Sequence, residues 1–174
     1  MDDADGMDGA DGMESASTVA FVATGRAGDD EMTDRIAAHR RERDPGWVTV
    51  ESPLDLVNGV RVALNAGRRS MVVVDCLSFW VANRLMECAP GLSGWAAVER
   101  ELCREVDVVA GLLRDHSAPT VVVTNEVGSG LVPDSPLGRQ FRDTLGRINA
   151  RVSLAADEAF LVVAGRVLIL EKPR

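Results

Sequence analysis

A histidine within a basic run is the residue of this sequence best suited to nucleophilic chemistry. His39 is one of two histidines, and it lies close to Arg35, Arg40, Arg41 and Arg43. Arginine side chains attract phosphate groups, and a neutral imidazole beside a bound phosphate can attack it. A basic run of this kind is also typical of a helix face that only meets solvent. The residues alone leave both interpretations of His39 open.

Polar residues follow several short apolar runs. Glu51 ends one run, Asp75 ends the segment MVVVD, and a third run ends in Ala23, Thr24 and Gly25. Because ligands of open parallel sheets gather at the carboxyl ends of strands, we expect these positions to share one edge. Polar strand ends are also common without any ligand. Asp75 has the setting of a carboxylate that holds Mg²⁺ beside a nucleoside triphosphate, and a structural strand end explains it equally well.

A glycine-punctuated loop, TNEVGSGLVP over residues 124–133, follows another apolar run. Backbone near glycine can approach a ligand closely, and Asn125 and Glu126 can both hydrogen-bond a polar substrate. Turn chemistry explains the glycines but not the Asn-Glu pair. The loop is not a phosphate loop, because it has no lysine followed by serine or threonine. Asn125 and Glu126 are therefore substrate-loop candidates.

The elements that must position these residues alternate between strand and helix. The spacing of apolar residues predicts strands over 18–24, 47–51, 70–75 and from 119, and helices after residue 29, after Ser52-Pro53, and over 77–87, 93–116 and 136–157. The last two apolar runs, AFLVVAG and RVLILE, are separated by Gly165-Arg166 only and predict a hairpin at one edge of the sheet. Alternation of this kind indicates an α/β fold with a mainly parallel sheet and helices on both faces.

Charge is concentrated at the amino terminus. The net charge is −8, but residues 1–14 hold six acidic residues and no basic one, so the rest has 21 acidic against 19 basic residues, or −2. That balance argues against a nucleic-acid surface. Residues 1–17 lack apolar periodicity and predict a disordered acidic leader, neither signal peptide nor structured domain. Residues 18–174 then form a single domain.

Three cysteines and the apolar runs indicate the compartment. Cys76, Cys88 and Cys103 are odd in number and lack metal-ligand spacing, which favours reduced thiols in the core. No apolar stretch approaches the roughly 20 residues that cross a bilayer. We therefore expect a cytoplasmic protein without a membrane span.

Three long segments in fixed order resemble one enzyme family. They are VAFVATGRAGDDEMTDRIAAHRRERDPGWVTVES, VVVDCLSFWVANRL and VVVTNEVGSGLVPDSPLGRQFRDTLGRINARVSLAADEAFLVVAG. They resemble the bifunctional adenosylcobinamide kinase/adenosylcobinamide-phosphate guanylyltransferases of cobalamin biosynthesis. The resemblance implies a RecA-like P-loop fold, usually a homotrimer. It also implies a transferase that phosphorylates adenosylcobinamide and moves GMP from GTP to adenosylcobinamide phosphate through a guanylylated histidine, with ATP, GTP and Mg²⁺ as expected cofactors.

The same resemblance assigns roles to individual residues. His39 falls on the histidine that accepts GMP. The positions that it implies to contact nucleotide are Ala23, Thr24, Gly25, Arg40, Arg41, Glu42, Arg43, Glu51 and Asp75. The segment TNEVG of the family matches residues 124–128.

One family motif is not found in this sequence. Family members begin with a strand and a phosphate-binding loop, G-x-x-x-S-G-K-S, and no G-K-[ST] occurs anywhere here. We expect the fold without its first strand and loop, with the sheet re-formed, with the gap filled by another chain or segment, or with a true start upstream. Because that loop positions the γ-phosphate, kinase activity should suffer more than guanylyl transfer. A non-catalytic corrinoid- or nucleotide-binding, or assembly, subunit is the alternative function.

Overall fold

The computed structural model describes residues 19–66, 70–88 and 92–172. The leader predicted over residues 1–17 lies outside these residues. The elements, in chain order, are β1 (Val19–Ala23), α1 (Asp30–Glu42), β2 (Val48–Glu51), α2 (Leu56–Asn65), β3 (Met71–Asp75), α3 (Leu77–Glu87), α4 (Leu92–Arg114), β4 (Thr120–Val123), α5 (Pro136–Ala155), β5 (Ala159–Val163) and β6 (Arg166–Leu170).

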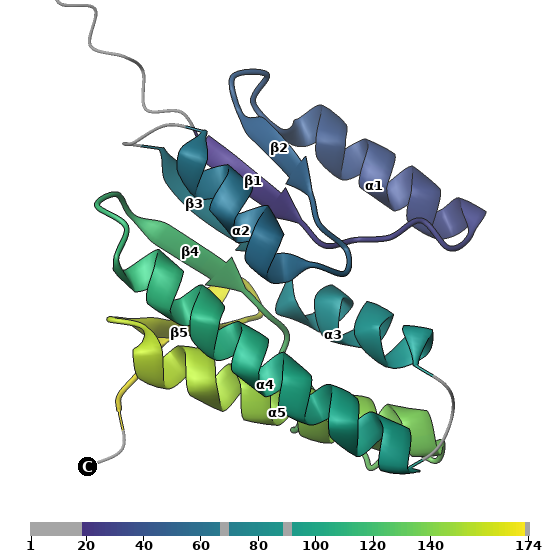
Figure 1. Cartoon of the computed structure of the whole chain (residues 1–174). Coiled ribbons are helices and arrows are strands. Elements are labelled where there is room, and N and C mark those ends of the chain that lie inside the picture. Colours follow the sequence, from purple (N-terminus) through teal and green to yellow (C-terminus); the bar gives the residue numbers. More distant parts are fainter. Residues whose placement is uncertain (1–18, 67–69, 89–91, 173–174) are drawn as a thin grey trace, which may run out of the picture.

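A parallel sheet forms the centre of the fold (Figure 1). Over the described residues it has four strands in the order β2-β1-β3-β4, and each neighbouring pair is parallel. In the register of these pairs, Ala23 lies opposite both Glu51 and Asp75. The α/β class with a mainly parallel sheet is therefore confirmed, and the predicted strand ends do share one edge.

The first two helices begin at aspartate caps. The carboxylate of Asp29 accepts a hydrogen bond from the Met32 backbone N–H, which satisfies a free donor of α1 and fits the helix predicted after residue 29. The predicted start of α2 at Ser52-Pro53 is wrong, because Asp55 caps that helix instead and accepts from Asn58 N. The Ser52 hydroxyl donates to the carbonyl of Asp55, so Ser52 braces the loop before the helix.

The core lies mainly on one face of the sheet. Val72 and Val74 of β3 are fully buried, whereas Met71, Val73 and Asp75, which alternate with them, are half-buried. The buried face meets α2, which crosses in front of β1 and β3 in Figure 1, and the core continues into α3, α4 and α5. Its largest fully buried side chain is Trp80, whose indole N–H donates to the carbonyl of Leu54.

The prediction of a carboxyl-terminal hairpin is confirmed, but its predicted place at the edge of the parallel sheet is wrong. β5 and β6 pair antiparallel, and the turn residues Ala164 and Gly165 both have positive φ, the geometry of a tight two-residue hairpin turn. The hairpin forms a two-stranded sheet of its own rather than extending the edge of the parallel sheet. Val121 and Val123 of the outermost strand β4 are each 40% exposed, and no strand within the described residues pairs with the outer edge of β4.

The thiols and the helix lengths agree with two further predictions. Cys76, Cys88 and Cys103 are all free, as predicted, although only Cys76 is buried and the other two are half-buried. None of the described helices is both long enough and apolar enough to span a bilayer.

Candidate active site

A buried hydroxyl joins the ends of the two central strands. Thr24, immediately after β1, is fully buried; its Oγ1 donates to the carbonyl of Cys76 at 2.6 Å and accepts from the Cys76 N–H at 2.8 Å. The Thr24 N–H donates to the carbonyl of Asp75. Asn83 of α3 completes the connection by donating to the carbonyls of Thr24 and Pro53. Thr24, a predicted nucleotide-binding position, therefore connects the end of β1 to the end of β3 through buried hydrogen bonds.

The basic run of α1 faces a cavity at the same edge. Three of its arginines line a cavity of about 450 Å³, together with the turn after the helix and two residues of β2; the full lining is Arg40, Arg41, Arg43, Asp44, Pro45, Trp47, Thr49 and Glu51. Arg40 forms an ion pair with Glu51 at 2.6 Å. Arg41 donates its Nε to the carbonyl of Ala37, and no carboxylate within the described residues pairs with it. The lining of the cavity has three arginines and two carboxylates, and it therefore carries a net positive charge. Glu51 is the carboxylate at the end of β2.

Arg43 is fixed by an aromatic ring. Its guanidinium carbon lies 3.9 Å from the centroid of the Phe21 ring, and its terminal nitrogen donates to the Thr49 hydroxyl. Burial lowers the pKa of Arg43, although the carboxylates of Glu51 and Asp75 oppose that shift. An arginine remains charged even so. Arg43 therefore places a permanent positive charge at the base of the cavity, within the field of both predicted acidic residues.

His39 lies on the neighbouring stripe of α1 and does not line the cavity. Its side chain is 71% exposed, and Nδ1 lies 3.9 Å from a carboxylate oxygen of Glu42, one turn later. Because α1 has no fully buried residue, the polar pattern of the helix matches its solvent exposure. Gly25 lies under this helix, where an added Cβ would stand 3.6 Å from Ile36. The structure thus leaves His39 open to a ligand that reaches over the arginines.

The substrate-loop candidates lie apart from this cavity. Asn125 donates to the Ser78 hydroxyl at 2.9 Å, and its carbonyl accepts from the Asn149 side chain. The carboxylate of Glu126 accepts from the backbone N–H of Gly128. An added Cβ at Gly128 would stand 2.7 Å from that same oxygen, so a larger residue at 128 would displace the Glu126 carboxylate.

Asp75, the predicted magnesium ligand, is not part of a cluster of metal-binding side chains within the described residues. No group of three or more His, Cys, Asp or Glu side chains within the described residues could hold a metal ion. Asp75 is a half-buried carboxylate at the end of β3. Magnesium often binds through one carboxylate together with substrate phosphates and water. The residues present therefore fit a metal delivered with a nucleotide and do not form an all-protein cage.

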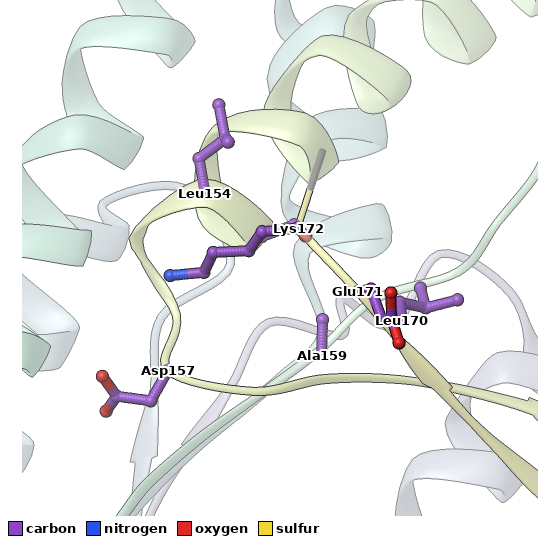
Figure 2. A pocket seen from close by; sticks show the side chains of 7 residues that line it. Leu154, Asp157, Ala159, Leu170, Glu171 and Lys172 are labelled. Atoms are coloured by element: carbon purple, nitrogen blue, oxygen red, sulfur yellow. The ribbon is translucent and has the colours of Figure 1, made fainter. Parts of the chain in front are cut away.

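A second, smaller cavity of about 40 Å³ lies where α5 meets the hairpin. Figure 2 shows Leu154 of α5 and Asp157 of the turn that follows it beside Ala159, Leu170 and Lys172 of the carboxyl-terminal segment. Its volume is enough for water but far too small for a nucleotide or a corrinoid. None of the predicted site residues lines it.

Three residues of the site region carry no prediction from the sequence. Trp47 was expected only as a strand residue, yet it precedes β2 and lines the cavity. Asn83 and Ser78 lie in α3, where apolar spacing hides their buried polar contacts. A signal existed for Trp47, because an aromatic residue directly follows the basic run and its Asp-Pro-Gly turn. No sequence signal marks the other two.

Comparison with known proteins supports one family. The family model described as cobinamide kinase / cobinamide phosphate guanyltransferase matches residues 9–170. The bifunctional adenosylcobalamin biosynthesis proteins CobU of Escherichia coli (strain K12) and Salmonella typhimurium are each 36% identical over 154 residues, covering 86% of this chain and 84% of theirs. The corresponding protein CobP of Pseudomonas aeruginosa is 34% identical over 151 residues, covering 87% and 81%. The chain therefore belongs to the cobinamide kinase / cobinamide phosphate guanyltransferase family, a family of transferases.

Proposed function

We propose that the chain transfers GMP from GTP to adenosylcobinamide phosphate, with His39 as the intermediate carrier. The observation that carries this proposal is the joint placement of His39, Arg40 and Arg41 on the last turn of α1, with Arg43 at its C-cap, beside a cavity of nucleotide size. Family membership names the reaction class, and the helix supplies both a nucleophile and the charges that a triphosphate requires.

His39 would act through Nε2. Glu42 lies 3.9 Å from Nδ1, beyond hydrogen-bond distance. A small side-chain movement that closed this gap would place a proton on Nδ1 and leave Nε2 with its lone pair. Nε2 attacks the α-phosphorus of GTP, an N–P bond forms, and the bond to the bridging oxygen breaks with pyrophosphate as the leaving group. In the second step a phosphate oxygen of adenosylcobinamide phosphate attacks the same phosphorus, and the N–P bond breaks to restore His39.

The arginines would neutralise the leaving group. Arg41 has no carboxylate partner within the described residues, and Arg40 can exchange Glu51 for a phosphate oxygen. Mg²⁺ bound at Asp75 with the phosphates would supply further positive charge. These contacts act most strongly where charge develops as pyrophosphate departs.

The kinase half of the family activity has less support in this chain. The single lysine of the sequence is Lys172, near the carboxyl terminus, and the sequence contains no phosphate-loop motif. That observation favours the second candidate, a corrinoid- or nucleotide-binding subunit without phosphoryl transfer. ATP or GTP as phosphoryl donor, a homotrimeric assembly and the cytoplasm as compartment stay predictions.

The test is to incubate the purified chain with Mg²⁺ and GTP labelled at the α-phosphate. We expect acid-labile label on the wild-type chain and on His116→Ala, and none on His39→Ala. His116 is the matched control, because it is the other histidine, its ring hydrogen-bonds the carbonyl of Ser70, and it does not line the arginine cavity. GTP labelled at the γ-phosphate should leave no label. Absence of label on the folded wild-type chain would reject the transfer reaction and favour the binding subunit.

A further inference from the structure

One aromatic side chain in the arginine cavity has no role in the proposed chemistry. Trp47 lines the cavity and is 37% exposed, whereas Trp80 is fully buried and Trp95 is 8% exposed. Covering the exposed part of an apolar ring with a second flat ring is favourable. Trp47 is therefore a candidate contact for a ligand in this cavity.

Local contacts hold Trp47 in place before any ligand arrives. The turn that follows α1 closes through a hydrogen bond from the Trp47 N–H to the carbonyl of Asp44, and the Asp44 carboxylate also accepts from the Gly46 N–H. The indole stacks on Phe21, with ring centroids 6.1 Å apart and an interplanar angle of 23°. A ring fixed in this way loses little conformational entropy when a second ring stacks on it.

The surroundings of Trp47 match a nucleotide in both chemistry and size. The Trp47 ring shares the cavity lining with Arg41, whose side chain has no carboxylate partner within the described residues. Arg43 also lines the cavity, with its guanidinium over the Phe21 ring on which Trp47 stacks. Aromatic rings stack on bases while arginines bind phosphates. A volume of about 450 Å³ suits a nucleotide and is too small to enclose a corrinoid with its side chains.

We infer that Trp47 is the platform on which the purine base of the guanine nucleotide stacks, with the phosphates directed to the arginines of α1. The inference rests on the proposed function for the identity of the nucleotide. It adds a binding residue on the turn after α1, and it assigns the base and the phosphates to separate parts of one cavity. Stacking tolerates any base, so Trp47 contributes affinity for purine nucleotides and does not select guanine.

Fluorescence of the full chain tests the stacking directly. GDP with Mg²⁺ serves as the probe because it binds without turnover, and inorganic pyrophosphate serves as the matched probe without a base. We expect GDP to quench tryptophan emission of the wild-type chain and pyrophosphate to leave it unchanged. In Trp47→Leu, where Trp80 and Trp95 remain, GDP should cause no change.

Equilibrium dialysis with labelled GDP measures the contribution to binding. Trp47→Leu should weaken GDP binding by about 5- to 150-fold, and Trp47→Phe should lose much less. Pyrophosphate affinity should be equal in all three proteins. A purely structural role, acting through Phe21 and the turn, would instead lower the affinities for GDP and pyrophosphate together and would overturn the inference.

The outcomes separate this inference from guanylyl transfer. Quenching by GDP without labelling of His39 supports the platform and rejects the transfer. Labelling of His39 with unchanged emission at saturating GDP rejects the platform and leaves the transfer in place. No GDP binding by dialysis rejects both.

Discussion

At the scale of single residues, the polar edge of the sheet depends on Thr24. The Thr24 hydroxyl satisfies both the N–H and the carbonyl of Cys76 in a place without solvent. Buried backbone groups that lose a partner cost more than the net value of a hydrogen bond, because they are not returned to water. A side chain of the same shape but without a hydroxyl therefore cannot replace Thr24 without a loss of stability.

Replacing Thr24 by valine, which has nearly the same shape, should lower the free energy of unfolding by about 1–3 kcal/mol. Thr24→Ser is the matched control, because it keeps the hydroxyl and loses only a buried methyl group, at a cost of about 1 kcal/mol. Urea unfolding followed by circular dichroism measures both. Equal stability of Thr24→Val and the wild-type chain would show that water satisfies Cys76 after the exchange.

At the scale of elements, one arginine connects α3 to α4. Arg84 pairs with Glu101 at 3.0 Å and with Glu105 at 2.8 Å, and its side chain is 16% exposed. Partial burial lowers the pKa of Arg84, but its hydrogen bonds to Glu105 and its attraction to both carboxylates outweigh that effect, so the net pKa is raised. The ion pair thus favours the charged arginine in the folded chain.

Arg84→Met should reduce the free energy of unfolding by about 1–3 kcal/mol, less than a fully buried pair because Glu101 is half exposed. Arg151→Met is the comparison, because Arg151 pairs with Asp107 between α4 and α5 at the surface. Exposed pairs contribute little, so this variant should unfold like the wild-type chain. An equal loss of unfolding free energy in both variants would contradict the expectation that the partly buried ion pair contributes more than the exposed one.

The elements themselves could be predicted from the sequence more fully than their arrangement. Apolar runs such as MVVVD mark strands because parallel strands are buried, and Asp29 marks the start of α1 by its capping chemistry. The start of α2 and the placement of the hairpin depend on contacts between distant residues, which local patterns do not encode. The edge shared by Glu51 and Asp75 was predictable because parallel topology dictates it. The cavity with Trp47 was not, because it depends on how α1 lies against β2.

At the scale of the whole molecule, apolar surface is concentrated on the carboxyl-terminal hairpin. Its exposed side chains, called here the hairpin surface, are Phe160, Val162, Val163, Val167, Leu168, Ile169 and Leu170. Two-stranded hairpins are marginally stable alone, and contiguous apolar surface promotes association. The free edge of β4 adds unpaired backbone groups to the same molecule.

Ile169→Lys should therefore reduce concentration-dependent association of the purified chain while leaving its thermal unfolding nearly unchanged. Ile169 is 74% exposed, so the charge meets solvent and displaces no core contact. Val108→Lys, at a position 45% exposed on α4, tests whether any added lysine has this effect. Sedimentation velocity over a range of concentrations measures association. A similar reduction in both variants would indicate net charge as the cause, rather than the hairpin surface.

The position of β1 in the sheet has a consequence for synthesis of the chain. β1 is made first among the described strands, yet it lies between β2 and β3, and all three belong to residues 19–75. Three of the four strands described in the parallel sheet can therefore pair while α4, β4 and α5 are still being translated. At about 5–20 residues per second, the 80 residues that follow Asp75 up to Ala155, counted from 155 less 75, take roughly 4–16 s. Until α4 and α5 emerge, the buried face of β3 lacks part of the core that covers it in the folded chain, and we expect the nascent chain to contact chaperones in that interval.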